Sequence, residues 1–370
     1  DNLKNTLTSG IGFGAMAAIG SKAVSAIGSG LKSLTAGAIS AGANFENAMS
    51  SVAAISGATG SDFDRLSEKA KQLGKSTQYT ASETASAMEY MAMAGWKTED
   101  MLNGIEGVMD LAAASGEDLA GVSDIVTDAM TAFGLSADGT TKIIKDGFTK
   151  EVSNASHFAD VLAAASANSN TNVAMLGESF KYAAPVAGSL GYSVEDTAIA
   201  LGLMASSGLK SSMAGSSLRT ILTNLAKPTD DISDAMDYLG ISLQNGDGSM
   251  KSLMDIVTDL RGAFGQCKMP MDQFQENLAK LDEKYANGEL TEKKYNEALA
   301  DLTEKAYGAE GALKAKYAAT LAGKEGMSGL LSIVSAAPED FDKLTNAIYN
   351  SDGAAKEMAE IKMDNLQTMS

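Results

Sequence analysis

Glycines recur along this chain at the ends of apolar stretches with helical periodicity, and capping residues follow many of them. Such glycines end helices because they adopt the left-handed conformation without a side-chain clash. The candidate ends are Gly74, Gly95, Gly134, Gly191, Gly240 and Gly265. Hydroxyl residues followed by acids are typical of helix starts, and the candidates are Ser61, Thr80, Thr98, Ser115, Ser193 and Thr229. No alternating β-branched run bounded by turns predicts a sheet. We therefore expect an all-α, multi-helix, bundle-like fold.

One pattern occurs twice. The stretch "GWKTED" begins at Gly95, and "GYSVED" begins 96 residues later at Gly191. A duplicated active site would use the paired acids, but adjacent acids at a solvated helix start rarely acquire shifted pKa values. A motif that ends one helix and starts the next fits better. Trp96 and Tyr192 would then each pack over the first turn of the next helix, as in a hydrophobic staple. Weaker sequence similarities around the two motifs predict an internal duplication of a helical unit.

The composition changes twice along the chain, which suggests three blocks. Residues 1–44 are Gly/Ala-rich apolar helices, 45–265 form the duplicated helical core, and 266–370 hold a helical hairpin and C-terminal helices. The hairpin is expected at about 271–306, where apolar residues recur with 4-3-4 spacing on both sides of Asn287-Gly288. Its charged outer faces are typical of an inserted arm.

The charge and the rare residues exclude several classes of protein. There are 29 Lys and Arg against 47 Asp and Glu, a net charge of −18, which disfavours specific nucleic-acid binding. A single cysteine, Cys267, excludes an internal disulfide and a cysteine-based zinc cluster. A single histidine, His157, beside Phe158 near a helix start, is expected to be packed or to cap. We predict no catalytic residues, no metal site, no cofactor and no enzyme.

An uncharged stretch near the N-terminus leaves two possibilities open. Residues 5–21 carry no charge, but they are shorter and more polar than the about 20 apolar residues of a spanning helix. Apolar residues at every fourth position favour close helix packing inside a bundle. Membrane insertion is the alternative. Because the chain begins with Asp1 and ends in "NLQTMS", we expect it to be a piece of a longer protein.

Several motifs occur in an order typical of one family. The most specific is "SSGLKSSMAGSSLRTILTNLAKP" from Ser206 to Pro228, and the others include "SAMEYMAMAGWKTEDML", "LGISLQNGDGSMKSLMDIV" and "GLLSIVSAAPEDFDKLTNAIYNSDGAAKEMAE". Together they resemble the core region of phage tail tape measure proteins, from about Asn44 to the C-terminus. The hairpin varies more than the rest.

The resemblance implies a structural protein of the virion. Such proteins lie inside the tail tube, set its length during assembly in the bacterial host cytoplasm, and leave ahead of the DNA at ejection. It implies contacts with the tail tube protein, the tail tip or baseplate hub proteins and assembly chaperones. Symmetry of the particle would favour a trimer or hexamer. It implies no catalytic residues in this region.

A protein that sets tail length by its own length, which we call the ruler, must be extended. A continuous α-helix rises about 1.5 Å per residue. With 37 glycines and repeated cap and stop signals, this chain is expected to form about a dozen short helices. We therefore expect a folded module, with the measuring helices elsewhere in the parent protein. The alternatives are a membrane-active segment at residues 5–43 that forms a channel for genome delivery, and, less favoured, a cell-wall hydrolase or an unrelated scaffold. Trp96 and Tyr192 are the first candidates for partner anchors, although staple packing fits both better.

Overall fold

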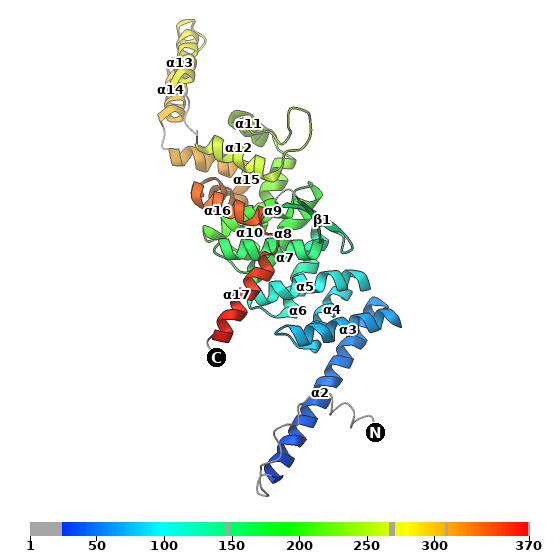
Figure 1. The fold of residues 1–370 in the computed structure, drawn as a ribbon. Coiled ribbons are helices and arrows are strands. Elements are labelled where there is room, and N and C mark those ends of the chain that lie inside the picture. Colours follow the sequence, from blue (N-terminus) through cyan, green and yellow to red (C-terminus); the bar gives the residue numbers. More distant parts are fainter. Residues whose placement is uncertain (1–23, 146–147, 266–270, 308–309, 369–370) are drawn as a thin grey trace.

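The computed structural model describes residues 24–145, 148–265, 271–307 and 310–368, which contain 16 helices and two strands (Figure 1). The all-α prediction is confirmed. The first helices are α2 (Val24–Ser56), α3 (Ser61–Ser76), α4 (Ala81–Met93), α5 (Thr98–Ser115), α6 (Leu119–Phe133), α7 (Asn154–Asn168), α8 (Val173–Ser189) and α9 (Val194–Ser206). The others are α10 (Ser211–Ala226), α11 (Asp230–Leu239), α12 (Leu253–Gly265), α13 (Met271–Ala286), α14 (Glu292–Tyr307), α15 (Glu310–Val334), α16 (Pro338–Tyr349) and α17 (Ala354–Thr368).

The helices of the body form two rows along its long axis. In the first row α2, α4, α6, α8, α10 and α15 pack side by side in that order. In the second row α3, α5, α7 and α9 pack in order, and α12 contacts α9. The late helices α16 and α17 fold back over the second row, α16 on α7 and α9 and α17 on α5 and α7 (Figure 1). One apolar core runs through both rows.

The same three-helix arrangement occurs twice in these rows. In α4–α5–α6 and again in α8–α9–α10, the first and third helices pack together in the first row, while the middle helix lies in the second. Each copy contains one of the two aromatic turn motifs between its first and second helices. This arrangement supports the predicted internal duplication.

Glycines allow neighbouring helices of the rows to approach closely. A β-carbon at Gly215 of α10 would lie 2.2 Å from the carbonyl oxygen of Ser179 on α8. At Gly188 of α8 it would lie 2.7 Å from the carbonyl oxygen of Phe133, next to the end of α6. Gly329 of α15 is similarly close to α10. Side chains at these positions would therefore push neighbouring helices of the first row apart.

Most of the predicted helix ends are confirmed. Thr80 forms a capping box with Glu83, and the hydroxyls of Ser193 and Thr229 accept hydrogen bonds from amides of the helices that they begin. Four predicted stops have positive φ angles just beyond a helix, namely Gly95, Gly134, Gly191 and Gly240. Gly265 is the last residue of α12.

Three predicted caps were wrong. Ser61 and Thr98 are the first residues of their helices, and the N-cap positions belong to Gly60 and Lys97. Ser115 ends α5, and the carboxylate of Asp118 caps α6 by accepting from the amide of Gly121. Only Asp118 supplies a side-chain cap among these three helix starts, because neither Gly60 nor Lys97 has a side-chain acceptor for the first amides. The predicted caps are thus displaced along the chain by one to three residues.

One predicted stop was also wrong. Gly74 lies inside α3, where a β-carbon would come within 2.5 Å of the backbone nitrogen of Ala81. Close packing against the start of α4, not helix termination, requires glycine there.

The expectation that no sheet forms needs a small correction. Strands β1 (Thr140–Lys145) and β2 (Phe148–Ser153) form an antiparallel hairpin between α6 and α7, with Thr141 opposite Val152. The sequence between them is Asp146-Gly147, a dipeptide typical of two-residue hairpin turns. The threonines and isoleucines before it, in "TTKIIK", favour a strand.

The predicted helical hairpin is formed by α13 and α14, which extend away from the body (Figure 1). The rings of Tyr285 and Tyr295 lie 4.7 Å apart near its turn, and Gly288 has a φ of 72° there. The predicted 4-3-4 spacing consists of Phe274, Leu278, Leu281 and Tyr285 before the turn and of Tyr295, Leu299, Leu302 and Ala306 after it. The side chains of Phe274 and Ala306 lie outside the described part, and so does residue Cys267.

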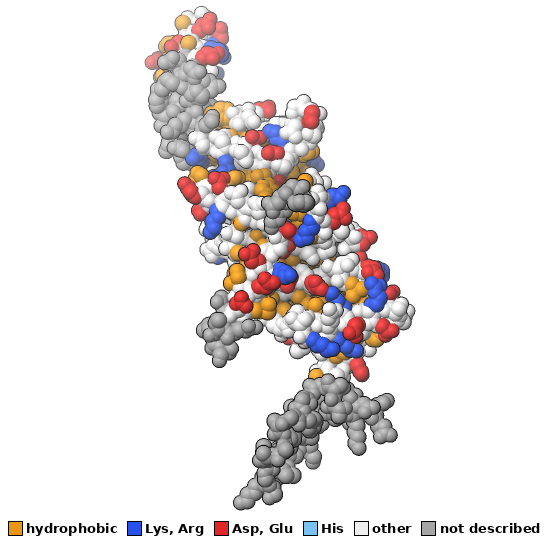
Figure 2. All heavy atoms as spheres, in the orientation of Figure 1, with side chains coloured by type: hydrophobic (Ala, Val, Ile, Leu, Met, Phe, Trp, Pro, Cys, Tyr) orange, Lys and Arg blue, Asp and Glu red, His pale blue; other side chains and the backbone are white. Residues whose placement is uncertain are grey.

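The helices are not uniformly short, because α2 has 33 residues and projects from the body (Figure 1). The expected helical packing of residues 5–21 lies outside the described residues. On the face shown in Figure 2, acidic and basic side chains are interspersed over the body, with small apolar areas between them.

Candidate functional site: the paired turn motifs and the C-terminal clamp

The first turn motif places Trp96 inside the protein. The amide of Trp96 donates to the carbonyl of Met91, and its side chain is 3% exposed. The ring lies against Gly104 of α5, where a β-carbon would come within 2.6 Å of ring atom Cζ3. The ring therefore packs over the second turn of α5, near Ala155 of α7.

The second motif repeats this geometry. The amide of Tyr192 donates to the carbonyl of Ala187, its side chain is 7% exposed, and burial raises the pKa of its hydroxyl. Because Trp96 and Tyr192 are both buried, neither presents its ring on the surface of this structure. We keep the staple role as a proposal for both residues.

The glutamates of the two motifs have different partners. Glu99 is exposed and forms a two-pronged ion pair with Arg65 of α3, whose hydrogen bond lowers the pKa of Glu99. Glu195 lies 2.8 Å from Nε2 of His157 on α7 and is mostly buried. Burial acts to raise the pKa of Glu195, but the hydrogen bond and charge of His157 outweigh it, and the pKa is lowered.

The aspartates of the two motifs differ more strongly. Asp100 accepts a hydrogen bond from the amide of Lys97, a local contact that satisfies its own helix. Asp196 is 3% exposed and binds two distant segments. Its Oδ2 accepts from the amide of Met254 at 3.1 Å, and its Oδ1 accepts from the hydroxyl of Tyr349 at 2.5 Å. Burial raises the pKa of Tyr349, and the bond to Asp196 adds to this effect.

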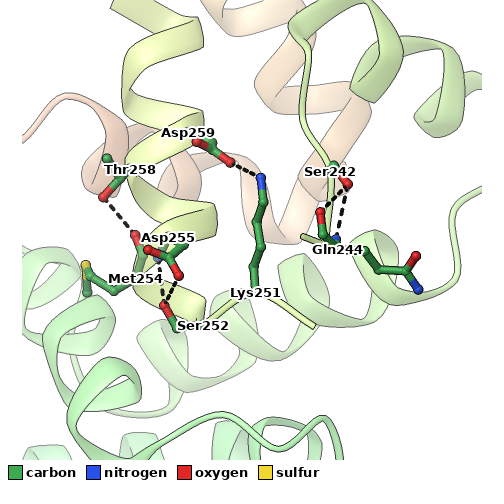
Figure 3. A network of polar contacts seen from close by, with 8 residues as sticks. All are labelled: Ser242, Gln244, Lys251, Ser252, Met254, Asp255, Thr258 and Asp259. Atoms are coloured by element: carbon green, nitrogen blue, oxygen red, sulfur yellow. Dashed lines mark hydrogen bonds and ion pairs between the residues drawn. The ribbon is translucent and has the colours of Figure 1, made fainter. Parts of the chain in front are cut away.

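The start of α12 is thus capped from two sides. Ser252 accepts from the amide of Asp255 and donates to its carboxylate (Figure 3). On the other side, Asp196 accepts from the amide of Met254. Lys251 is bound by Asp259 one turn further along (Figure 3). The amides at a helix start need such acceptors because they have no partners within the helix.

A second buried carboxylate holds the start of α17. Asp160 of α7 accepts from the amides of Gly353 and Ala355 at 2.9 and 3.0 Å. Burial raises the pKa of Asp160, although these two bonds act in the opposite direction. Negative charge is favourable at this end of a helix.

A half-buried arginine completes the attachment. Arg261 of α12 donates to the carbonyls of Ile333 and Ala336 at 2.7 and 2.8 Å, and its guanidinium lies 4.4 Å from the ring centre of Phe341. Burial lowers the pKa of Arg261. We call Asp160, Asp196 and Arg261 the C-terminal clamp, since together they fix residues 333–355 to α7, α9 and α12.

The clamp is suited to holding helices in register. Its charged groups are satisfied by backbone amides, backbone carbonyls and one phenol. Within the described ranges no group of three or more His, Cys, Asp or Glu is placed to hold a metal ion. Nδ1 of His157 is buried without a hydrogen-bond partner there.

The clamp was not predicted from the sequence. A signal was present for Asp160, because it is the lone acid in the apolar helical stretch "FADVLAAA", and a buried acid requires a partner. Nothing comparable marks Arg261 or Tyr349, whose partners are far away in the chain.

The sequence of this mainly helical chain places it in a class of protein. The chain belongs to the family of phage-related minor tail proteins, whose family model matches residues 67–281. The resemblance to phage tail proteins noted in the sequence is therefore confirmed.

Two relatives give a more particular likeness. The chain is 36% identical over 352 residues to the "Tape measure protein" of Pneumococcus phage Dp-1, covering 95% of this chain and 26% of that protein. It is 24% identical over 302 residues to the "Probable tape measure protein" of Escherichia phage P2, covering 81% and 30% respectively. The chain thus spans about a quarter to a third of the relatives' length. No solved structure matches it.

Proposed function

We propose that this chain is a folded module of a tape measure protein, located inside the tail tube of a phage or phage-derived particle. The parent protein would set tail length during assembly in the bacterial host cytoplasm and leave ahead of the DNA at ejection. The family match and the two relatives support a structural role in the tail.

One observation carries the assignment of this segment as a folded module instead of the ruler itself. Successive helices turn back on one another, so that α4, α6, α8 and α10 lie side by side in one row. A ruler of 370 residues in one helix would be about 560 Å long at 1.5 Å per residue. The C-terminal clamp holds the late helices on the second row and opposes extension.

Tail length in assembled particles tests this proposal. Deleting residues 271–307 removes the α13–α14 arm while leaving the two rows and the clamp in place. If this region measured length, tails would shorten by about 56 Å, which is 37 residues at 1.5 Å each. We expect unchanged length, read by electron microscopy against tails of the unaltered phage. Tails shortened by that amount would contradict a folded module.

The partners follow from the same proposal. We propose contacts with the tail tube protein, the tail tip or baseplate hub proteins and tail assembly chaperones, no specific nucleic acid, and a trimer or hexamer imposed by particle symmetry. Cross-linking of intact particles followed by mass spectrometry tests the contacts. Light scattering of the purified module tests the oligomer, and a monomer at all concentrations would count against self-association through this region.

The second candidate is a membrane-active segment at residues 5–43 that contacts the host membrane transiently. The helices of the described part include none that is both long enough and apolar enough to cross a membrane, and residues 1–23 lie outside that part. Leakage of liposomes by a peptide of residues 5–43, abolished by Gly14→Lys, would support this candidate. Intact liposomes at all peptide concentrations would remove it.

A further inference from the structure

The dipeptide Asn-Gly occurs three times in the chain, at Asn103-Gly104, Asn245-Gly246 and Asn287-Gly288. In such a dipeptide the backbone nitrogen of the glycine can attack the side-chain carbonyl carbon of the asparagine, because glycine has no β-carbon to crowd the attacking atom. The dipeptide alone does not rank the three positions, since each offers the same two reacting groups. Their surroundings in the fold differ, and this difference selects one of them.

Two of the dipeptides have their glycine nitrogen engaged in a hydrogen bond. Asn103-Gly104 lies inside α5, where backbone amides donate to carbonyls four residues earlier and side chains tilt away from the nitrogen that follows them. Asn287-Gly288 lies at the turn of the α13–α14 arm, and the amide of Gly288 donates to the carbonyl of Tyr285 at 3.0 Å. An engaged amide must break its hydrogen bond before its nitrogen reacts, so both positions are protected.

The third dipeptide lacks this protection. Asn245 and Gly246 are both exposed, in the loop between α11 and α12. The amide of Asn245 donates to the carbonyl of Ser249, and the amide of Gly248 donates to the carbonyl of Asn245. The amide of Gly246, between them, makes no hydrogen bond to any residue that the structure describes. Its nitrogen is therefore both exposed and unengaged.

We propose that Asn245 is a site of spontaneous deamidation, a modification that goes beyond the structural role in the tail and is independent of it. The nitrogen of Gly246 forms a bond to Cγ of Asn245, and the bond from Cγ to the side-chain nitrogen breaks. That nitrogen leaves as ammonia with the proton of the Gly246 amide. One water molecule then opens the cyclic imide at either carbonyl, giving aspartate or isoaspartate. Loss of the amide proton starts the reaction, so its rate rises with pH.

Deamidation removes a donor that holds the loop together. Nδ2 of Asn245 donates to Oγ of Ser249 at 3.0 Å, and that hydroxyl donates to Oδ1 of Asp247 at 2.6 Å. The hydrogen bonds from Ser249 lower the pKa of Asp247, so its carboxylate is charged at neutral pH. A carboxylate at position 245 competes with Asp247 for the same hydroxyl and repels it, and isoaspartate also lengthens the backbone. The turn therefore opens after the reaction.

The turn is joined directly to the segment that starts α12. Gln244 and Met250 form an isolated bridge across it, and the amide of Lys251 donates to the carbonyl of Leu243 at 2.8 Å. Figure 3 shows both ends of this loop, with Lys251 bound by Asp259 of α12. Opening of the turn lowers the protection of the loop amides from hydrogen exchange and leaves the two rows intact.

Mass spectrometry of the purified chain tests the site. The chain is incubated at pH 8 in heavy-oxygen water, and the oxygen taken up at each of the three asparagines is followed by peptide mapping. We expect Asn245 to react about fivefold faster than Asn287, the factor that corresponds to one backbone hydrogen bond of about 1 kcal/mol. Asn103 should react most slowly. No uptake at Asn245, or uptake as fast at either of the other two, would overturn the assignment.

Two variants separate the chemistry from its consequence. Gly246→Ala adds a β-carbon that meets no atom within 4 Å, so the loop keeps its fold while the attack is crowded. Oxygen uptake at residue 245 should then fall severalfold with Asn287 unchanged, and undiminished uptake would contradict attack by the glycine nitrogen. Asn245→Asp carries the charge of the product from the start, and its loop amides should exchange faster than in the fresh unaltered chain, with α8 and α10 as references. Loop exchange that is unchanged both in Asn245→Asp and in the incubated chain would overturn the opening of the turn.

Discussion

The hydroxyl of Tyr349 donates a hydrogen bond of 2.5 Å to Oδ1 of Asp196, joining the last turn of α16 to the first turn of α9. The two residues are 153 positions apart in the chain. The same carboxylate binds the amide of Met254, so one buried aspartate connects three helices. Asp100, at the equivalent position of the first motif, binds only its own helix start.

Removing the hydroxyl of Tyr349 should weaken the C-terminal clamp without disturbing the backbone. Tyr349→Phe leaves one oxygen of Asp196 without its donor, and we expect a loss of about 1–3 kcal/mol in the free energy of unfolding. Urea denaturation followed by circular dichroism measures the change. Tyr285→Phe, on the exposed α13–α14 arm, is the control and should change stability by less than about 0.5 kcal/mol. Equal effects of the two substitutions would show that the contact with Asp196 contributes nothing.

Glycine should be required where neighbouring helices of the first row touch and dispensable where no neighbouring helix is close. Gly215→Ala brings a β-carbon against the carbonyl of Ser179, and we expect destabilisation by about 1–3 kcal/mol as α8 and α10 separate. Gly262 lies in α12, where an added β-carbon would meet no neighbouring atom within 4 Å, so Gly262→Ala should stabilise by up to about 1 kcal/mol. Thermal unfolding of both variants makes the comparison. Destabilisation of similar size in both would mean that helix packing does not decide the outcome.

The two motif glutamates should respond differently to acid. The pKa of Glu195 is lowered in the folded state, so its contribution to stability is present above its unfolded pKa of about 4.5 and is lost as the pH falls through the folded value. Glu195→Gln should therefore be less stable than the unaltered chain at pH 7, with the difference shrinking below pH 4.5.

Glu99→Gln provides the matched control for this experiment, because its ion pair with Arg65 is exposed to solvent and screened. Denaturant unfolding at pH 7, 5 and 3.5 gives the pH profiles. A constant difference between Glu195→Gln and the unaltered chain over this range would exclude the ionic contribution of the pair with His157.

Fluorescence of the single tryptophan distinguishes a packed staple from a partner anchor. With 3% of its side chain exposed, Trp96 should be poorly quenched by acrylamide in the folded module and strongly quenched in urea. Trp96→Ala should cost about 3–5 kcal/mol, since it opens a large cavity beside Gly104. Ready quenching in the folded state, with little loss of stability in Trp96→Ala, would favour the anchor.

Local features of the fold could be predicted because their partners are close in the chain. Ser193 caps α9 by accepting from the amide of Asp196, three residues away, and Gly191 ends the preceding turn. The α13–α14 arm could be predicted from the spacing of its apolar residues and the Asn287-Gly288 turn signal, because its two helices are adjacent in sequence and pack on each other. The β1–β2 hairpin was missed although its Asp-Gly dipeptide was visible, since the helical signals on both sides dominated the interpretation.

The sequence by itself determined the helical class, most helix ends and the repeated motif, since capping and termination are satisfied within about four residues. Only the tertiary structure decided that Asp100 stays local while Asp196 binds Met254 and Tyr349. It also decided which glycines end helices and which, like Gly74 and Gly215, admit a neighbouring backbone. The physical reason is that burial and close approach depend on segments brought together from distant parts of the chain. The residues next to Asp100 and Asp196 in the sequence are similar, so they do not reveal which of the two aspartates has distant partners.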